Sequence, residues 1–229
     1  QQKIETNNYG IRENLLKYDE VNNEQREVVY AERRQVLDGE NMRELIMKML
    51  NDVVEGAVDM SISDEQTPEN WGFKELNDLL LPIIPLKPIE LTEEIKKMNK
   101  DEFKHMLKEL ATKFYESKEA EFPDAEQIRE IERVVLLKVI DNKWMSHIDD
   151  MDQLRQGIGL QAYGQRDPVV EYKMAAFDMF NSMITSIQED TVRMLYHVHV
   201  EQKIEREQVA KVTGTNKDDS SVRKPVSYT

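Results

Sequence analysis

The chain has 229 residues, of which 33% are charged, and its formal net charge is −14 at pH 7. This negative charge opposes attraction to phosphate backbones, so we expect no nucleic-acid partner. The chain contains no cysteine, which excludes a disulfide framework, and no apolar run approaches the roughly 18 residues that a membrane-spanning helix needs. Glycine and proline are sparse and strong β-formers rarely alternate, which predicts an all-α fold.

Residues 1–60 are predicted to form a first domain built on one long helix. Charged and polar residues fill a helical pattern that is already running at Gln1, so we interpret the chain as a piece of a longer protein. The Asp38-Gly39 pair interrupts this pattern, and Asn41 is a candidate N-cap for a second helical stretch. Whether the break kinks or ends the first helix is open at this point.

Residues 61–124 differ in composition and are predicted to form a small helical domain. Prolines cluster here at Pro68, Pro82, Pro85 and Pro88. Because proline lacks an N–H donor and fixes φ, we expect the PIIPLKP segment to be an irregular connector. The helix that follows has an apolar stripe made of Phe103, Met106, Leu107, Leu110 and Phe114.

Residues 125–209 are predicted to form a projecting antiparallel hairpin of two helices. Apolar residues recur at steps of three and four on both sides of a glycine-rich segment, GIGLQAYGQRDP at residues 157–168. Asp167 is a suitable N-cap and Pro168 a suitable first residue for the second arm, so this segment becomes the exposed tip. Residues 210–229 are polar and lack capping signals, which is typical of a disordered tail or linker.

Two long runs carry a family resemblance. The run DNKWMSHIDDMDQLRQGIGLQAYGQRDPVVEYK resembles the two-helix finger of the SecA family, the motor ATPases of bacterial preprotein translocation. The run NNYGIRENLLKYDEVNNEQREVVYAER resembles the long scaffold helix of that family. The resemblance extends from Gln1 to about Val209. It implies that residues 1–60 and 125–209 form the helical scaffold domain, that residues 61–124 form the helical wing domain, and that the motor is absent.

The motor chemistry of that family is not expected in this chain. An ATP-binding P-loop needs the pattern G-x-x-x-x-G-K-[ST], which does not occur here, so we expect the fragment not to be an enzyme. The resemblance assigns ATP and Mg to nucleotide-binding domains outside the chain. Zinc is expected to be absent together with the family's Cys-rich tail, because that module needs thiolate ligands. We therefore expect no cofactor in the fragment.

The resemblance also implies partners and a location. Within one polypeptide the fragment would contact the nucleotide-binding and preprotein-binding domains, and beyond it the SecY channel complex, the preprotein and its signal peptide. The intact protein would be found in the bacterial cytoplasm, peripherally associated with the cytoplasmic membrane. Its scaffold would couple ATP-driven movement to preprotein translocation. Two other classes stay open: a free-standing helical scaffold or protein-interaction module without a motor, and a hydrolase with an acidic site in the wing.

The tip carries the residues expected to contact the preprotein. Tyr163 offers apolar area and a hydroxyl group without demanding one partner sequence, which suits a moving chain, and Leu160 and Gln161 lie close to it in sequence. The resemblance implies the same role for a tip tyrosine. Gly159, Gln161 and Gly164 stand where the family often has His, Arg and Ala, which changes the charge and stiffness expected of the tip. The alternative is an ordinary connecting loop.

Two further sets of residues are candidates for contacts. The resemblance suggests that Asp19, Gln25 and Arg26 form part of the surface where the long helix meets the ATPase domains. From the residues alone, the acids of the run KYDEVNNEQR could be catalytic carboxylates with Arg26 as a positioning base, although an exposed ion-paired helix face is far commoner. The second set could line a groove for a signal sequence or a detachable domain, or could pack in the core. It consists of Trp144, Met145 and Met151.

Histidines close to acidic residues invite a metal interpretation, which we reject. His147 is near Asp149, Asp150 and Asp152 in sequence, but residues two apart on a helix point to different sides. The same reasoning applies to the His-Val-His run at the end of the second arm. No Ser-His-Asp or Cys-His arrangement stands out, so we predict neither a metal site nor a catalytic residue.

Overall fold

The computed structural model describes residues 2–39, 41–161 and 167–198, and all regular structure in these ranges is helical. The all-α prediction is confirmed. The α-helices are α1 (Gln2–Asp38), α2 (Met42–Ser61), α3 (Phe73–Leu80), α4 (Lys100–Glu119), α5 (Ala125–Gln161) and α6 (Pro168–His197), and the short 3₁₀ helices are η1 (Pro68–Asn70) and η2 (Ile95–Lys97). None of the helices in these ranges is both long and apolar enough to cross a membrane.

The first helix ends at the glycine that interrupts its pattern. Gly39 has a φ of +75°, a left-handed conformation that glycine adopts without the steric cost of a Cβ. Its N–H donates to the carbonyl oxygen of Val36 at 3.3 Å, which closes the last turn of α1. Asn41 precedes α2 as predicted, but its side chain makes no capping hydrogen bond. The break therefore separates two helices rather than kinking one.

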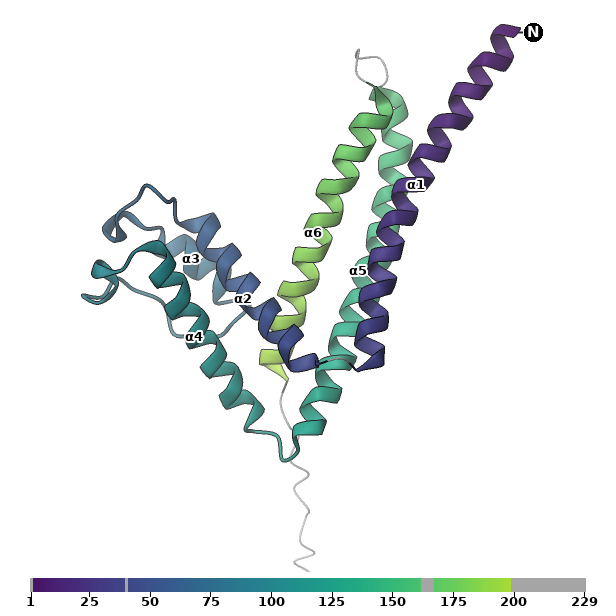
Figure 1. Cartoon of the computed structure of the whole chain (residues 1–229). Coiled ribbons are helices and arrows are strands. Elements are labelled where there is room, and N and C mark those ends of the chain that lie inside the picture. The colour runs from purple at the N-terminus through teal and green to yellow at the C-terminus, as the bar shows by residue number, and fades with distance from the viewer. Residues whose placement is uncertain (1, 40, 162–166, 199–229) are drawn as a thin grey trace, which may run out of the picture. The chain divides into compact units, whose positions relative to one another are not determined.

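The two arms of the hairpin, α5 and α6, lie side by side and run antiparallel (Figure 1). The carboxylate of Asp167 accepts a hydrogen bond from the N–H of Val169 at 2.9 Å. Pro168 takes the first helical position, where a missing N–H costs nothing. The predicted start of the second arm is confirmed.

The long helix α1 packs along this hairpin and lies next to α5 in Figure 1. Asp19 pairs with Arg155 and Arg33 pairs with Asp141, so α1 and α5 run antiparallel. The buried face of α1 recurs at steps of three, four and seven, as a helix packed along one side requires. It consists of Tyr18, Val21, Gln25, Val29 and Val36.

Two hydrophobic clusters hold these helices together. The main core joins the second half of α1 to α2, α3, α4, α5 and α6. Its fully buried side chains include Leu50, Phe103, Leu107, Leu136 and Leu195. A smaller group, which we call the tip-side cluster, joins the first half of α1 to the upper hairpin. It consists of Tyr18, Val21, Met151, Ile158, Val169, Tyr172 and Ala176.

The proposed wing thus shares the main core with α2, α5 and α6. The division into residues 1–60, 61–124 and 125–209 stays a prediction, and the predicted tail at residues 210–229 lies outside the described residues. Within the wing, the side-chain amide of Asn77 accepts a hydrogen bond from the N–H of Ile89 and donates to its carbonyl oxygen, both at 2.8 Å. These bonds support the proline-rich connector, which is irregular as predicted.

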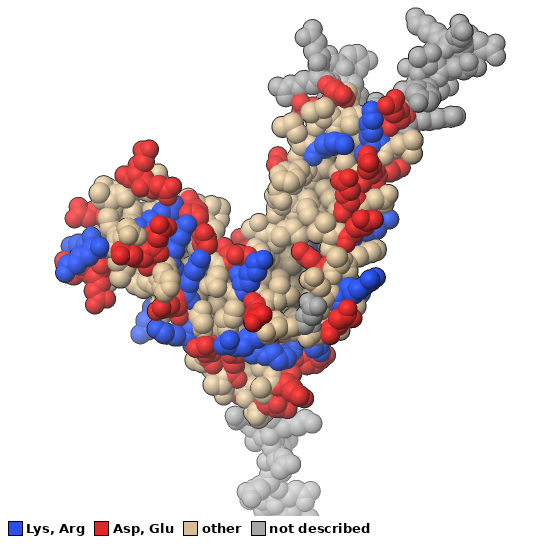
Figure 2. All heavy atoms as spheres, in the orientation of Figure 1, with Lys and Arg blue, Asp and Glu red and all other residues tan. Residues whose placement is uncertain are grey.

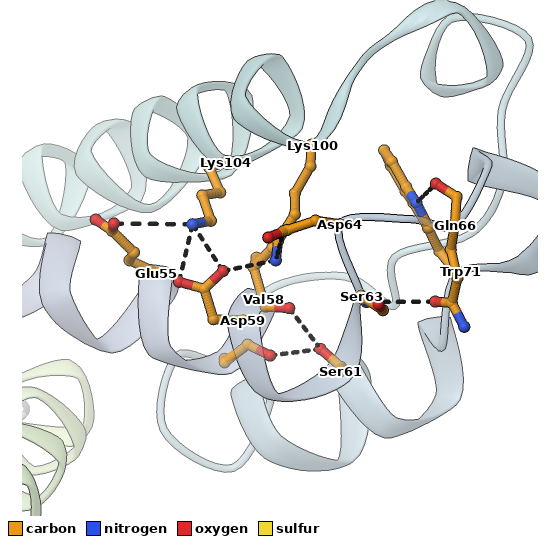
Figure 3. A network of polar contacts seen from close by, with 11 residues as sticks. Glu55, Val58, Asp59, Ser61, Ser63, Asp64, Gln66, Trp71, Lys100 and Lys104 are labelled. Atoms are coloured by element: carbon orange, nitrogen blue, oxygen red, sulfur yellow. Dashed lines mark hydrogen bonds and ion pairs between the residues drawn. The ribbon is translucent and has the colours of Figure 1, made fainter.

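Acidic and basic side chains alternate over the wing helices (Figure 2), and a ladder of ion pairs joins α4 to α2 (Figure 3). Lys104 Nζ lies 2.7 Å from an oxygen of Asp59 and 3.8 Å from Glu55. Lys100 Nζ lies 2.8 Å from Asp59 and 2.6 Å from Asp64. Hydrogen bonds from the two lysines hold the pKa of the Asp59 carboxyl below its usual value. Lysines four residues apart on α4 therefore face acidic residues four apart on α2.

Candidate functional site

A groove follows the seam between α1 and α5, and we call it the seam groove. Trp144 lines both of its hollows. The tip-side hollow has a volume of about 420 Å³, and its lining includes Asp19, Asn22, Gln25, Arg26, His147 and Arg155. The base-side hollow has a volume of about 670 Å³, and its lining includes Tyr30, Arg33, Arg34, Leu37, Asp141 and Met145.

A buried hydrogen-bond junction between three helices borders the tip-side hollow. Gln25 of α1 donates its side-chain N–H to the carbonyl oxygen of Ala176 in α6 at 3.0 Å. Its side-chain oxygen therefore faces His147 of α5, whose Nε2 lies 2.8 Å away and carries the shared proton. Burial lowers the pKa of the His147 ring, and the charge of nearby Asp150 opposes this shift. The neutral ring is the form that this site favours.

Two tyrosines close the seam nearer the tip. The ring centroids of Tyr18 and Tyr172 lie 4.5 Å apart, and the Tyr172 hydroxyl donates to the side-chain oxygen of Asn22 at 3.0 Å. Burial raises the pKa of both tyrosines, so their hydroxyl groups keep their protons at neutral pH. At the edge of the hollow, Arg155 lies 3.6 Å from Asp19. Polar contacts from α1 thus reach both arms of the hairpin.

The base-side hollow combines charged side chains with exposed apolar ones. Arg33 donates to both carboxylate oxygens of Asp141, at 2.9 and 3.4 Å. Tyr30, Leu37 and Met145 line the same hollow and are 55%, 51% and 63% exposed. Apolar side chains gathered around a concave surface are typical of a protein-binding site. This hollow is therefore a candidate docking surface.

A row of exposed apolar side chains also follows α6. Val170, Met174 and Phe177 are 52%, 61% and 64% exposed and recur at steps of four and three, so they share one face of the helix. Figure 2 shows a largely uncharged surface along this arm. The hairpin therefore presents apolar area beyond what packs against α1.

Residues 1–199 match the family model described as the SecA wing and scaffold domain. The chain belongs to the SecA wing and scaffold family. The protein translocase subunit SecA of Lachnoclostridium phytofermentans is 65% identical over 99% of this chain and 26% of its own length. Subunit SecA 1 of Alkaliphilus metalliredigens is 44% identical over 98% of this chain and 25% of its own length. Subunit SecA of Finegoldia magna is 47% identical over 99% of this chain and 24% of its own length. The chain spans about a quarter of these SecA relatives, and the family resemblance is confirmed.

The seam groove of this SecA domain gathers most of the residues predicted to make contacts. Asp19 and Arg26 are exposed and line the tip-side hollow. Gln25 lines it too, but it is only 8% exposed and its amide is already bonded on both sides. Of the three residues predicted to meet the ATPase domains, Gln25 is therefore committed to contacts inside the chain. The role of the other two stays a prediction.

The second predicted set divides between core and surface. Trp144 and Met151 are 8% and 3% exposed and belong to the main core and the tip-side cluster respectively. Met145 is the exposed member, at the edge of the base-side hollow. A binding role for these three residues remains a prediction. Burial of Trp144 and Met151 agrees with the packing alternative for those two positions.

The predicted preprotein contact at Tyr163 lies outside the described residues. Helix α5 includes Leu160 and Gln161, but their side chains also lie outside the described part. Among the residues that are described, no group of three or more His, Cys, Asp or Glu side chains is placed to hold a metal ion. His147 lies in the seam instead, whereas Asp149 is exposed.

The sequence analysis did not predict a series of alternating acidic and basic side chains that links α2, α4 and α5. Arg43 of α2 contacts Glu119 of α4 at 3.4 Å, and Glu119 in turn pairs with Arg129 of α5. Arg129 donates to both oxygens of Glu132 at 2.6 Å, and Glu132 is completely buried. One signal could have identified it: Glu132 lies four residues from both Ile128 and Leu136, on the buried stripe of α5.

Proposed function

We propose that this chain is the scaffold and wing part of a SecA translocation motor, and that the seam groove receives other domains of the same polypeptide. The observation that carries the proposal is the exposed apolar edge of the base-side hollow, formed by Tyr30, Leu37 and Met145. Covering such side chains is favourable because it removes apolar area from water. The relatives extend well beyond the quarter of their length that this chain spans, so further polypeptide is the expected cover.

In this proposal the chain is mechanical rather than catalytic. ATP and Mg²⁺ bind to nucleotide-binding domains outside it, and those domains press on α1 at the groove. Because α1, α5 and α6 share the junction at Gln25, movement of α1 is passed to the hairpin. Arms of 37 and 30 residues are about 55 and 45 Å long at about 1.5 Å per residue. The tip, with Tyr163, would meet the preprotein at the SecY channel on the cytoplasmic side of the membrane.

The exposed row on α6 supports a contact between the hairpin and the preprotein or its signal peptide. Met174 and Phe177 offer apolar area that packing among the described residues does not use. A thioether side chain is flexible and adapts to apolar partners that differ in detail, as signal peptides do. The row begins within three residues of the tip segment at residues 157–168, so one polypeptide could contact both.

Docking is tested by mixing the full 229-residue chain with a separately produced remainder of a SecA protein. We expect binding and a changed ATPase rate of the remainder. Met145→Glu should weaken binding at least about tenfold without lowering the melting temperature, because it places a charge in an apolar contact. Met60→Glu is the matched control, because Met60 is 65% exposed, lies near the C-terminal end of α2 and does not line the seam groove. Equal effects of the two variants, or no binding at all, would rule out docking at the seam groove.

The role of the tip is tested separately in a whole SecA protein that carries this segment. Tyr163→Ala should sharply reduce preprotein transport, whereas Tyr163→Phe should retain most of it, because the ring supplies the apolar area. A photocrosslinker at position 163 should capture the preprotein, and one at Glu116 in the wing should capture far less. Normal transport by the alanine variant would contradict the proposed contact.

A further inference from the structure

Among the described side chains of α1, the buried ones are apolar except at one position. Tyr18, Val21, Val29 and Val36 are buried in the two apolar clusters that α1 shares with the hairpin, and Gln25 stands between them at 8% exposure. Contacts of this kind are tolerant of sliding, because one aliphatic side chain can replace another at the next turn. The apolar stripe alone therefore does not define where along the hairpin α1 must lie.

The polar contacts of the seam are far less tolerant of sliding than the apolar ones. Gln25 uses its N–H on the carbonyl oxygen of Ala176 and its oxygen on His147. Asn22, one turn away, accepts the hydroxyl proton of Tyr172. Shifting α1 by one turn, about 5.4 Å, would separate all of these partners and leave buried polar groups without hydrogen bonds. A single buried polar residue is known to fix register in helical seams at some cost in stability.

Exposed ion pairs along the seam do not have the same effect. Asp19 with Arg155 and Arg33 with Asp141 each join a short aspartate to a long arginine side chain, and all four side chains are between 38% and 59% exposed. Such side chains can reach a new partner after a shift, and exposed pairs contribute little to stability. The buried, hydrogen-bonded polar groups of the seam are therefore the ones that select one register of α1.

We propose that Asn22, Gln25, His147 and Tyr172 form a polar joint that holds α1 in one register on the hairpin. Gln25 is a positioning residue in this scheme: it decides where along the groove the side chains of α1, Asp19 and Arg26 among them, lie. The joint lies wholly within this chain. Its test needs no partner and is independent of the docking proposed above.

The test compares two triple variants of the full chain. The joint variant, Gln25→Leu with His147→Phe and Tyr172→Phe, replaces the polar contacts by apolar ones. The control variant, Gln35→Leu with His105→Phe and Tyr30→Phe, makes the same substitutions at exposed positions. Because the chain has no cysteine, single cysteines at the exposed positions Leu16 and Met174 give one unique pair of spin-label sites.

Double electron–electron resonance between the two spin labels then measures the distance between α1 and α6. We expect one narrow distribution for the unchanged chain and for the control. The joint variant should keep its helical content and melting temperature but show a second distance population, shifted by several ångströms as expected for a slide of about one turn. A single narrow distribution in the joint variant would overturn the proposal, whether or not the melting temperature falls, because the polar groups would then contribute only stability.

Discussion

Tyr115 of α4 donates its hydroxyl proton to the carboxylate of Glu132 in α5, with 2.5 Å between the two oxygens. Glu132 has no exposed surface, and the guanidinium of Arg129 donates to both of its carboxylate oxygens at 2.6 Å. Burial raises the pKa of Glu132, and the bonds from Tyr115 and Arg129 oppose that shift. The wing helix and the first arm of the hairpin are thus joined by a buried, charged hydrogen bond.

Removing this carboxylate should be costly. Glu132→Ala leaves the Tyr115 hydroxyl and part of the Arg129 charge without a partner, so we expect a loss of about 3 kcal/mol in the free energy of unfolding. Tyr115→Phe should cost about 1–2 kcal/mol, because it removes one hydrogen bond and keeps the ring. Urea unfolding followed by circular dichroism measures both values. Glu130→Ala, at an exposed position on the same helix, is the control, and a loss equal to that of Glu132→Ala would contradict this account.

The lysine ladder between α4 and α2 should respond to salt. Lys104→Met keeps most of the apolar stem but removes the charge that lies 2.7 Å from Asp59, and we expect a loss of about 1 kcal/mol at low ionic strength. In about 1 M salt the Debye length falls to about 3 Å, so the difference should shrink by at least about half. Lys113→Met, at a side chain that is 73% exposed, should have little effect under either condition. A salt-independent loss would show that Lys104 acts through packing alone.

Local signals in the sequence predicted the elements of this fold. The Asp38-Gly39 pair predicted an interruption after α1, although not whether it ends or kinks the helix, and Asp167 with Pro168 predicted the start of α6. Turn and capping chemistry depends on residues only a few positions apart. The apolar steps of three and four likewise predicted which helix faces pack inward. These are properties that a short stretch of chain determines by itself.

The polar interior could not be predicted in the same way. Lys100 meets Asp64 across 36 residues of sequence, and Gln25 meets Ala176 across 151. A glutamine or lysine on a charged helix is exposed by default, and only the arrival of a distant partner makes burial tolerable. The groove is similar, because its two walls are 100 or more residues apart, so the sequence could suggest its residues but not their grouping. Residues 162–166 of the tip, where the resemblance was most informative, lie outside the described residues.

The junction at His147 should make stability depend on pH. The folded protein lowers the pKa of this ring below its usual 6.5, so the unfolded chain binds the proton more readily. The stabilisation is therefore complete above about pH 6.5 and is lost as the pH falls through the folded pKa. We expect the melting temperature of the unchanged chain to fall, relative to that of His147→Phe, between about pH 7.5 and about pH 5.

His105→Phe is the matched control for this titration, because the His105 side chain is 76% exposed. Its pH profile should follow that of the unchanged chain. Glu132 titrates with the opposite sign, since its raised pKa makes stability fall as the pH rises above the usual carboxyl range. Only the difference between the His147→Phe profile and the unchanged one isolates the ring. Parallel profiles would mean that His147 is solvated.

The end of α1 should depend on glycine. Gly39→Ala places a Cβ at a φ of +75°, about 3.3 Å from the guanidinium of Arg133, so we expect a loss of about 1 kcal/mol. Gly39→Asn should cost less than Gly39→Ala, because asparagine tolerates the left-handed region better. Both values come from thermal unfolding. A stabilising alanine would show that α1 and α2 can form one continuous helix.

Residue order has a consequence during synthesis of the protein. Of the described helices, α1 is synthesised before the others, but its Gln25 cannot form the hydrogen bond to Ala176 until that residue is added, 151 residues later. At about 5–20 residues per second, the ribosome needs roughly 8–30 s for that stretch. α2, α3 and α4 can meet one another in the meantime, whereas Val21 and Val29 of α1 have no hairpin to cover them. Of these helices, α1 is thus synthesised first but stays uncovered until the hairpin is made, which exposes its apolar face to chaperones and to aggregation during synthesis.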